Sequence, residues 1–80
     1  MYYVYLLESE SDRTRRYIGL TRDLRRRLQD HNAGNSLHTA KYKPWHVVTY
    51  LAFSDQSKAE TFERYLKSGS GHAFARKRLW

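Results

Sequence analysis

Residues 1–80 contain 40% hydrophobic side chains, enough for a single domain with one small core. The absence of cysteine excludes disulfides and thiolate metal sites. Fifteen Lys and Arg against eight Asp and Glu give a formal charge of +7, which favours a polyanionic partner such as nucleic acid, or less often an anionic membrane, over a merely solvated basic surface. The apolar run at residues 2–7 is too short for a signal peptide or a membrane span, so we expect a cytoplasmic protein with no membrane partner.

The first third of the chain predicts two strands followed by a helix. Residues 2–7 are rich in β-formers and apolar on both faces, which predicts a strand that is covered on both sides. A polar loop leads to a second short strand at 16–20, and a connection of this length favours antiparallel pairing. Thr21 is the expected N-cap of a helix that runs to about Asn32 and stops at residues 33–35.

The predicted helix presents a mixed apolar and basic surface. At 100° per residue, Leu24 and Leu28 form its buried stripe. Arg25 and Arg27 flank this stripe on opposite edges, so the helical wheel does not choose between them. His31 lies beside the stripe and follows Arg27 by one turn, the i, i+4 spacing that brings two side chains together.

The middle of the chain predicts a third strand and a second helix. After an irregular polar segment at 34–43, residues 46–53 carry the strongest β-signal. Ser57 and Glu60 match a capping box, so the second helix is expected to begin there. Glu63 lies at the margin of the apolar stripe of this helix.

The end of the chain predicts a short third helix. Residues 68–71 read Ser-Gly-Ser-Gly and are expected to interrupt the second helix. Residues 72–79 then form the third helix, from which Phe74, Leu79 and Trp80 are expected to return to the core. The predicted order is β-β-α-β-α-α, an α+β fold.

Several polar side chains suit phosphodiester cleavage. This reaction needs a group that activates the nucleophile, a positive charge near the phosphate, and a metal or a general acid at the leaving oxygen. Two phenols, an arginine fork, an imidazole and one carboxylate for Mg²⁺ would meet these needs. The candidates are Tyr5, Tyr17, Arg27, His31 or His38, and Glu63. Each also has an ordinary interpretation, because strand tyrosines usually lie in the core and arginine runs usually face solvent.

The sequences YVY at 3–5 and YIG at 17–19, followed by Arg27 and His31, resemble the GIY-YIG nuclease family. The segment 62–69, FERYLKSG, resembles the glutamate-bearing helix of the compact single-domain members. The resemblance covers nearly the whole chain. It implies a three-stranded antiparallel sheet flanked by helices, and an endonuclease that cuts DNA with Mg²⁺ or Mn²⁺.

The resemblance also implies residue roles. Tyr5 and Tyr17 correspond to the paired motif tyrosines, one of which assists deprotonation of the attacking water. The resemblance selects Arg27 over Arg25 as the arginine that stabilises the phosphate. Gly19 corresponds to the glycine at a strand end that passes close to the site. His31 falls where the family carries a histidine or a tyrosine, and Glu63 corresponds to the metal-binding carboxylate. The chain departs from the pattern at Tyr3, where the family name has glycine, and in having no asparagine after Asn35.

The expected substrate is branched, flapped or duplex DNA, recognised by its structure because so small a domain has no room for a sequence-reading module. A protein partner or a homodimer would help targeting, and repair, recombination and mobile-element roles are all open. The alternatives are a non-catalytic nucleic-acid-binding module of the same fold and a protein-interaction subunit that binds an acidic partner. The expected DNA contacts are Arg25, Arg26, His38, Lys41, Lys43, Lys67 and Arg76.

Overall fold

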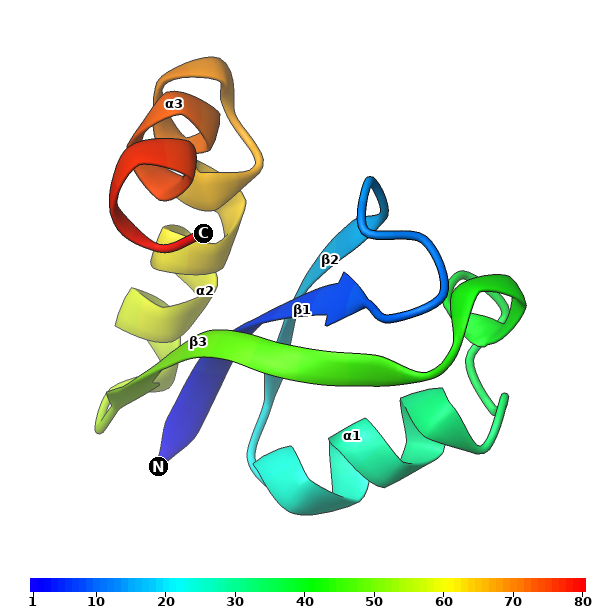
Figure 1. Ribbon diagram of the computed structural model, residues 1–80. Helices are drawn as coiled ribbons and strands as arrows, with labels where there is room; N and C mark the ends of the chain where they lie inside the picture. The colour runs from blue at the N-terminus through cyan, green and yellow to red at the C-terminus, as the bar shows by residue number, and fades with distance from the viewer.

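A computed structural model describes residues 1–80 and has the predicted order of elements (Figure 1). One antiparallel sheet, in the order β2-β1-β3, is formed by β1 (Tyr2–Ser9), β2 (Arg16–Thr21) and β3 (Trp45–Phe53). The helices are α1 (Leu24–Asn32), the short 3-10 helix η1 (Ala40–Tyr42), α2 (Gln56–Leu66) and α3 (Gly69–Arg78). The structure confirms the predicted α+β fold. No helix in it has the length and apolar character that crossing a membrane requires.

The central strand β1 supplies both halves of the core. Val4 and Leu6 are fully buried on the face that α2 and α3 cover. Tyr5 and Leu7 point to the opposite face, where they pack with Leu24 and Leu28 of α1. The prediction that this strand is covered on both sides is therefore confirmed. β1 continues to Ser9, two residues past its predicted end, because those residues still pair with the beginning of β3.

Helices α2 and α3 form a tight pair. A Cβ added at Gly71 would overlap the backbone carbonyl of Tyr65, so glycine lets α3 begin this close to the end of α2. Leu66, the last residue of α2, is fully buried in the same cluster. This packing fixes the C-terminal half of α2, the part that carries Glu63.

Two helices begin at residues other than the predicted ones. Asp23, not Thr21, caps α1, because its carboxylate accepts a hydrogen bond from the Arg26 N–H at 3.1 Å. The Thr21 hydroxyl instead accepts from the Asp23 N–H in the preceding turn. Asp55 caps α2 by accepting from the Ser57 N–H at 3.3 Å, so Ser57 lies inside the helix and the predicted capping box is wrong.

The third helix also differs from the prediction. Its N-cap is Ser68, and the helix begins at Gly69 rather than at residue 72. Phe74 is 39% exposed instead of returning to the core, because the smaller Ala75 takes the core-facing position. The ring of Phe74 lies 6.1 Å from that of Tyr65, which is exposed to the same extent. The last two residues of the chain pack against the core as predicted.

Candidate active site

Four of the predicted site residues meet around the phenol of Tyr5. The Tyr5 side chain is only 1% exposed, and its hydroxyl lies 3.0 Å from Nε2 of His31. Arg27 donates to the same hydroxyl through Nε at 3.4 Å. The ring of Tyr17, on β2, lies 6.3 Å from that of Tyr5 and 5.0 Å from that of His31. Strands β1 and β2 and the helix that follows them therefore build one polar cluster inside the α1-covered face of the sheet.

Gly19 makes room for this phenol. The register of the hairpin pairs Gly19 directly with Tyr5. A Cβ at Gly19 would overlap the Tyr5 hydroxyl and would lie 2.9 Å from the ring atom Cε1. The resemblance predicts a strand end that passes close to the site, and the structure supplies a more specific reason for glycine: the tyrosine of the neighbouring strand lies across it.

The structure places the two flanking arginines in different surroundings. Arg27 contacts Tyr5 and faces the cluster. Arg25, on the other edge of α1, lines a separate groove with Val47 and Tyr50 of β3. The two arginines therefore serve different parts of the surface.

His31 is fully buried, whereas the sequence places it only beside the apolar stripe. Its Nδ1 lies 2.6 Å from the hydroxyl of Thr39, which is also fully buried. The Trp45 indole donates to the Thr39 carbonyl at 2.8 Å, and the Asn32 amide donates to the Trp45 carbonyl at 3.0 Å. These bonds join the end of α1 to the beginning of β3 and fix the imidazole. Sequence reasoning missed Thr39, Asn32 and Trp45, and no motif or spacing marks them.

The directions of the hydrogen bonds follow from the donors available. Because the Arg27 guanidinium has only donors, the Tyr5 oxygen accepts from it, and we assign the phenol proton to the bond with Nε2 of His31. This leaves the proton of the imidazole on Nδ1, which donates to Thr39. The result is a continuous chain from Arg27 through Tyr5 and His31 to Thr39.

The electrostatics of the cluster agree with these assignments. Burial raises the pKa of Tyr5, and the hydrogen bond from Arg27 opposes that rise. Burial, followed by the charge of Arg27, lowers the pKa of His31 below its ordinary value of 6.5. The hydrogen bond to Tyr5 is the main cause that raises the pKa of Arg27. Near pH 7 the cluster therefore consists of a neutral phenol, a neutral imidazole and one guanidinium cation.

Glu63 approaches the cluster from α2. Its side chain is 20% exposed, and Lys67 donates to Oε2 at 2.9 Å. Burial is the main cause that raises the pKa of Tyr5; the charge of Tyr17 raises it further, and the negative charge of Glu63 makes the smallest contribution in that direction. Lys67 and Tyr17 line the same groove, so this part of α2 lies next to the edge strand β2.

The protein side chains alone do not form a metal cage. No group of three or more His, Cys, Asp or Glu residues is placed to hold a metal ion. Mg²⁺, however, is commonly held by one or two carboxylates together with water and substrate phosphate oxygens. Lys67 engages one of the two oxygens of Glu63. This single carboxylate therefore fits a Mg²⁺ site of the open kind, completed by water and substrate, and does not fit a closed protein site.

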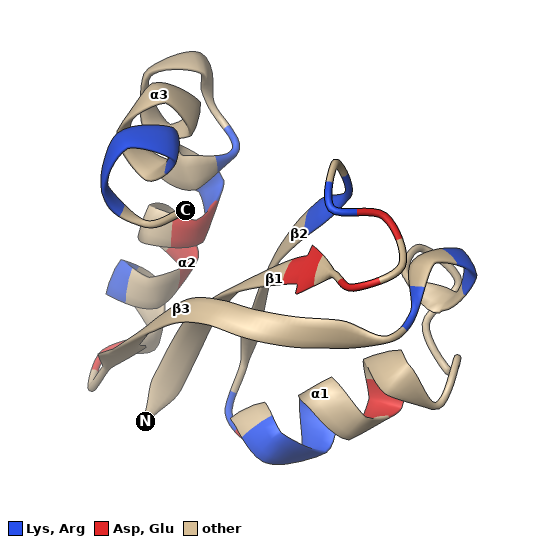
Figure 2. Ribbon diagram, viewed as in Figure 1, with Lys and Arg blue, Asp and Glu red and all other residues tan.

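The other predicted DNA contacts lie on the surface at several places. Figure 2 shows basic residues on α1, around η1 and on the two C-terminal helices, with acidic residues near the end of β1. All seven predicted side chains are exposed: Arg25, Arg26, His38, Lys41, Lys43, Lys67 and Arg76. Of these, Lys67 is the one that joins the site, through its contact with Glu63.

The α+β domain brings tyrosines of two adjacent strands together with an arginine and a histidine of the following helix. Residues 1–77 match the family model described as the GIY-YIG catalytic domain. The chain belongs to the GIY-YIG family, as the two tripeptides and the residues after them predict.

The chain is also similar to proteins from three organisms. A UPF0213 protein of Cupriavidus pinatubonensis is 35% identical over 80 aligned positions, which cover 95% of this chain and 87% of that protein. The structure-specific endonuclease subunit SLX1 homolog of Giardia intestinalis is 37% identical over 65 residues, 76% of this chain but only 18% of that longer protein. The solution NMR structure of a UPF0213 protein from Bacillus halodurans has a TM-score of 0.57 at 27% identity, covering 99% of this chain and 87% of that one.

Proposed function

We propose that this protein is a metal-dependent DNA endonuclease that hydrolyses phosphodiester bonds. The observation that carries the proposal is the convergence of Arg27, Tyr17 and His31 on the buried phenol of Tyr5, in a chain of the GIY-YIG family. A cluster with only a structural purpose has no need of a guanidinium cation. Here the Arg27 cation is held by the buried Tyr5 beside the half-buried Tyr17, where a phosphate could be bound and attacked.

Arg27 is the residue that binds the scissile phosphate. Its Nε is engaged by Tyr5, which orients the guanidinium and leaves the terminal Nη groups for two phosphate oxygens. Because the orientation is fixed before the substrate arrives, the positive charge stabilises the extra negative charge of the transition state without reorganisation.

The two tyrosines have different roles in this proposal. Tyr5 is buried and already bonded to Arg27 and His31, so it is a positioning residue. Tyr17 is only half-buried and borders the groove next to Lys67, so its hydroxyl orients the attacking water. His31 has no contact with solvent, and it holds Tyr5 through the bond to Nε2 rather than moving a proton to bulk water.

Glu63 would hold the divalent cation, either Mg²⁺ or Mn²⁺. When bound, such a cation stabilises negative charge on the phosphate and on the leaving oxygen. Lys67 donates to Oε2 and so competes with the cation for one of the two carboxylate oxygens.

The proposed substrate is DNA recognised by its structure, such as a branch or a flap. The net charge of +7 and the exposed basic residues support binding to the phosphate backbone, which carries no sequence information. The relative from Giardia is named as a structure-specific endonuclease subunit, which supports both this substrate class and a protein partner.

Incubation of branched, flapped and plain duplex DNA with the protein, in Mg²⁺, in Mn²⁺ and in chelator, tests the proposal. We expect nicking that requires the metal and that Glu63→Gln and Tyr17→Phe both lose. Glu60→Gln, one turn earlier on α2, is the matched control and retains activity. Tight, salt-sensitive binding without nicking in any condition would instead indicate the non-catalytic nucleic-acid-binding module.

A further inference from the structure

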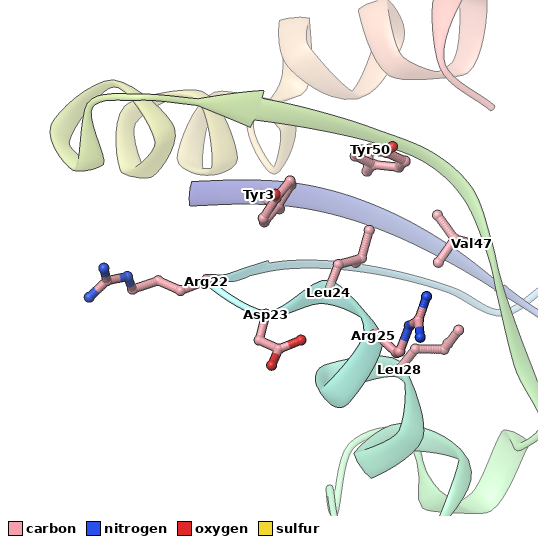
Figure 3. A pocket seen from close by; sticks show the side chains of 8 residues that line it. All are labelled: Tyr3, Arg22, Asp23, Leu24, Arg25, Leu28, Val47 and Tyr50. Atoms are coloured by element: carbon pink, nitrogen blue, oxygen red, sulfur yellow. The ribbon is translucent and has the colours of Figure 1, made fainter. Parts of the chain in front are cut away.

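A groove lies between α1 and the strands β1 and β3 (Figure 3). This groove has a volume of about 600 Å³, within the range of roughly 300–1,000 Å³ that is typical of ligand pockets. Leu24 and Leu28 of α1 and Val47 of β3 form its apolar floor. Tyr3 and Tyr50, on the neighbouring strands β1 and β3, form its aromatic wall.

The aromatic wall presents an open ring face. Tyr50 is 55% exposed, although it lies on the sheet face that α1 partly covers. Its ring meets the ring of Tyr3 edge to face, at 5.9 Å between centroids and 65° between planes. An edge-on contact of this kind leaves a face of the aromatic pair uncovered, and a planar group can stack there.

The rim of the groove is basic. Arg25 is exposed and extends beside Val47 (Figure 3). The stem of Arg22 borders the end of the groove next to β2. The head of Arg22 lies over the ring of Tyr2, 5.2 Å from the centroid. The one acidic residue at the rim, Asp23, is bonded to the backbone as the N-cap of α1. The groove therefore combines an apolar, aromatic interior with the guanidinium of Arg25 at its edge, while the head of Arg22 lies on Tyr2 outside it.

We propose that this groove binds an unpaired nucleobase of the DNA substrate. Aromatic platforms flanked by arginine or lysine are the chemistry that single-stranded nucleic acid recognises, because every base has a face that can stack and every nucleotide has a phosphate. A base inside a duplex is covered by its neighbours on both faces and cannot enter, so the groove selects an unstacked nucleotide.

The proposal rests on the proposed function and specifies its substrate. Tyr50 is the direct cross-strand partner of Tyr5, so the base groove and the catalytic cluster lie on adjacent strands. α1 passes between them, with Arg25 on the groove side and Arg27 on the cluster side. A DNA strand whose unpaired base is held at Tyr50 would run past α1 toward Arg27, which favours cleavage next to a single-stranded segment.

Binding of a fluorescein-labelled oligothymidylate, followed by fluorescence anisotropy in chelator, tests the groove without any cleavage. We expect Tyr50→Ala to raise the Kd about tenfold, the scale of one lost base-stacking contact. Tyr50→Phe keeps the ring and stays within about twofold of the unmodified protein, as does Tyr65→Ala, which removes an exposed tyrosine outside the groove. Binding of a plain duplex should change by less than about twofold in Tyr50→Ala. Thermal melting checks that each variant is folded.

An unchanged Kd for Tyr50→Ala on the oligothymidylate would overturn the proposal, as would an equal loss on single-stranded and duplex DNA. A dimer in sedimentation that Tyr50→Ala dissociates would also overturn it, because a second copy of the chain would then occupy the groove. Nicking in Mg²⁺ is measured separately. Nicking with an unchanged Tyr50→Ala affinity rejects the groove alone, and a Tyr50-dependent affinity with no nicking rejects the nuclease alone.

Discussion

Replacing Gly19 by alanine tests the geometry of the cluster. The added methyl group would occupy the position of the Tyr5 hydroxyl, so the phenol must move or the two strands must separate. Either movement breaks the bonds from Tyr5 to His31 and Arg27. Gly69→Ala is the control, because a Cβ there meets nothing within 4 Å.

The expected cost follows from three contributions. Overpacking a well-packed site costs about 1–3 kcal/mol, and leaving the buried His31 nitrogen without its partner costs about 1–3 kcal/mol more. Alanine recovers about 0.4–1 kcal/mol by restricting the unfolded chain. A net loss of about 3 kcal/mol lowers the Tm of a domain of this size by roughly 12–24 °C.

Thermal melting followed by circular dichroism measures the stability, and a nicking assay below the lower Tm measures the activity of the folded variant. We expect Gly19→Ala to melt lower and to nick at least tenfold more slowly, since Arg27 loses the contact that orients it. Gly69→Ala should keep the activity of the unmodified protein. A Gly19→Ala variant with unchanged Tm and unchanged activity would refute the close packing of the phenol over Gly19.

Three further predictions concern the residues around the cluster. Because the pKa of His31 is lowered by folding from its ordinary 6.5, the unfolded chain binds more protons just below that pH. The urea midpoint should therefore fall as the pH drops below about 6.5, and His31→Gln should reduce this dependence. Thr39→Val removes the hydroxyl bonded to Nδ1 and should lower the free energy of unfolding by about 1–3 kcal/mol, whereas the exposed Thr61→Val should change it by less than about 0.5 kcal/mol. Lys67→Met frees the carboxylate of Glu63, so half-maximal nicking should need up to about fivefold less Mg²⁺. A higher Mg²⁺ requirement would contradict the competition between Lys67 and the cation for Glu63.

The sequence predicts the fold well where the pattern is local. The continuous run of β-formers in residues 2–7 and the stop signal at 33–35 indicate β1 and the end of α1 directly. Cap positions are less predictable, because Thr21 and Asp23 are equally plausible by residue type, and only the backbone path decides which oxygen reaches the first free N–H. The position of Phe74 depends similarly on the tertiary packing of α3 against α2.

The candidate site needs both residue patterns and contacts between distant parts of the chain. The i, i+4 spacing joins Arg27 to His31, but periodicity alone leaves Arg25 equivalent to Arg27. The choice depends on Tyr5, which lies 22 residues before Arg27 in the chain. Thr39 has no sequence signal, because its importance comes from a polar segment that folds back under His31. The Tyr3–Tyr50 wall likewise requires the pairing of β1 with β3.

The three consecutive arginines of α1 give the most direct test of the central claim that the cluster around Tyr5 is catalytic. They differ in environment but not in charge: Arg27 contacts Tyr5, whereas Arg25 and Arg26 are exposed away from it. The measurement is the single-turnover rate of Mg²⁺-dependent DNA nicking at saturating protein for each arginine-to-alanine variant. We predict a loss of about 10²–10³ for Arg27→Ala, as for a preorganised transition-state contact, and losses of no more than a few-fold for the other two. Equal losses in all three variants would contradict the claim. They would indicate that the three arginines only bind DNA as part of a basic surface.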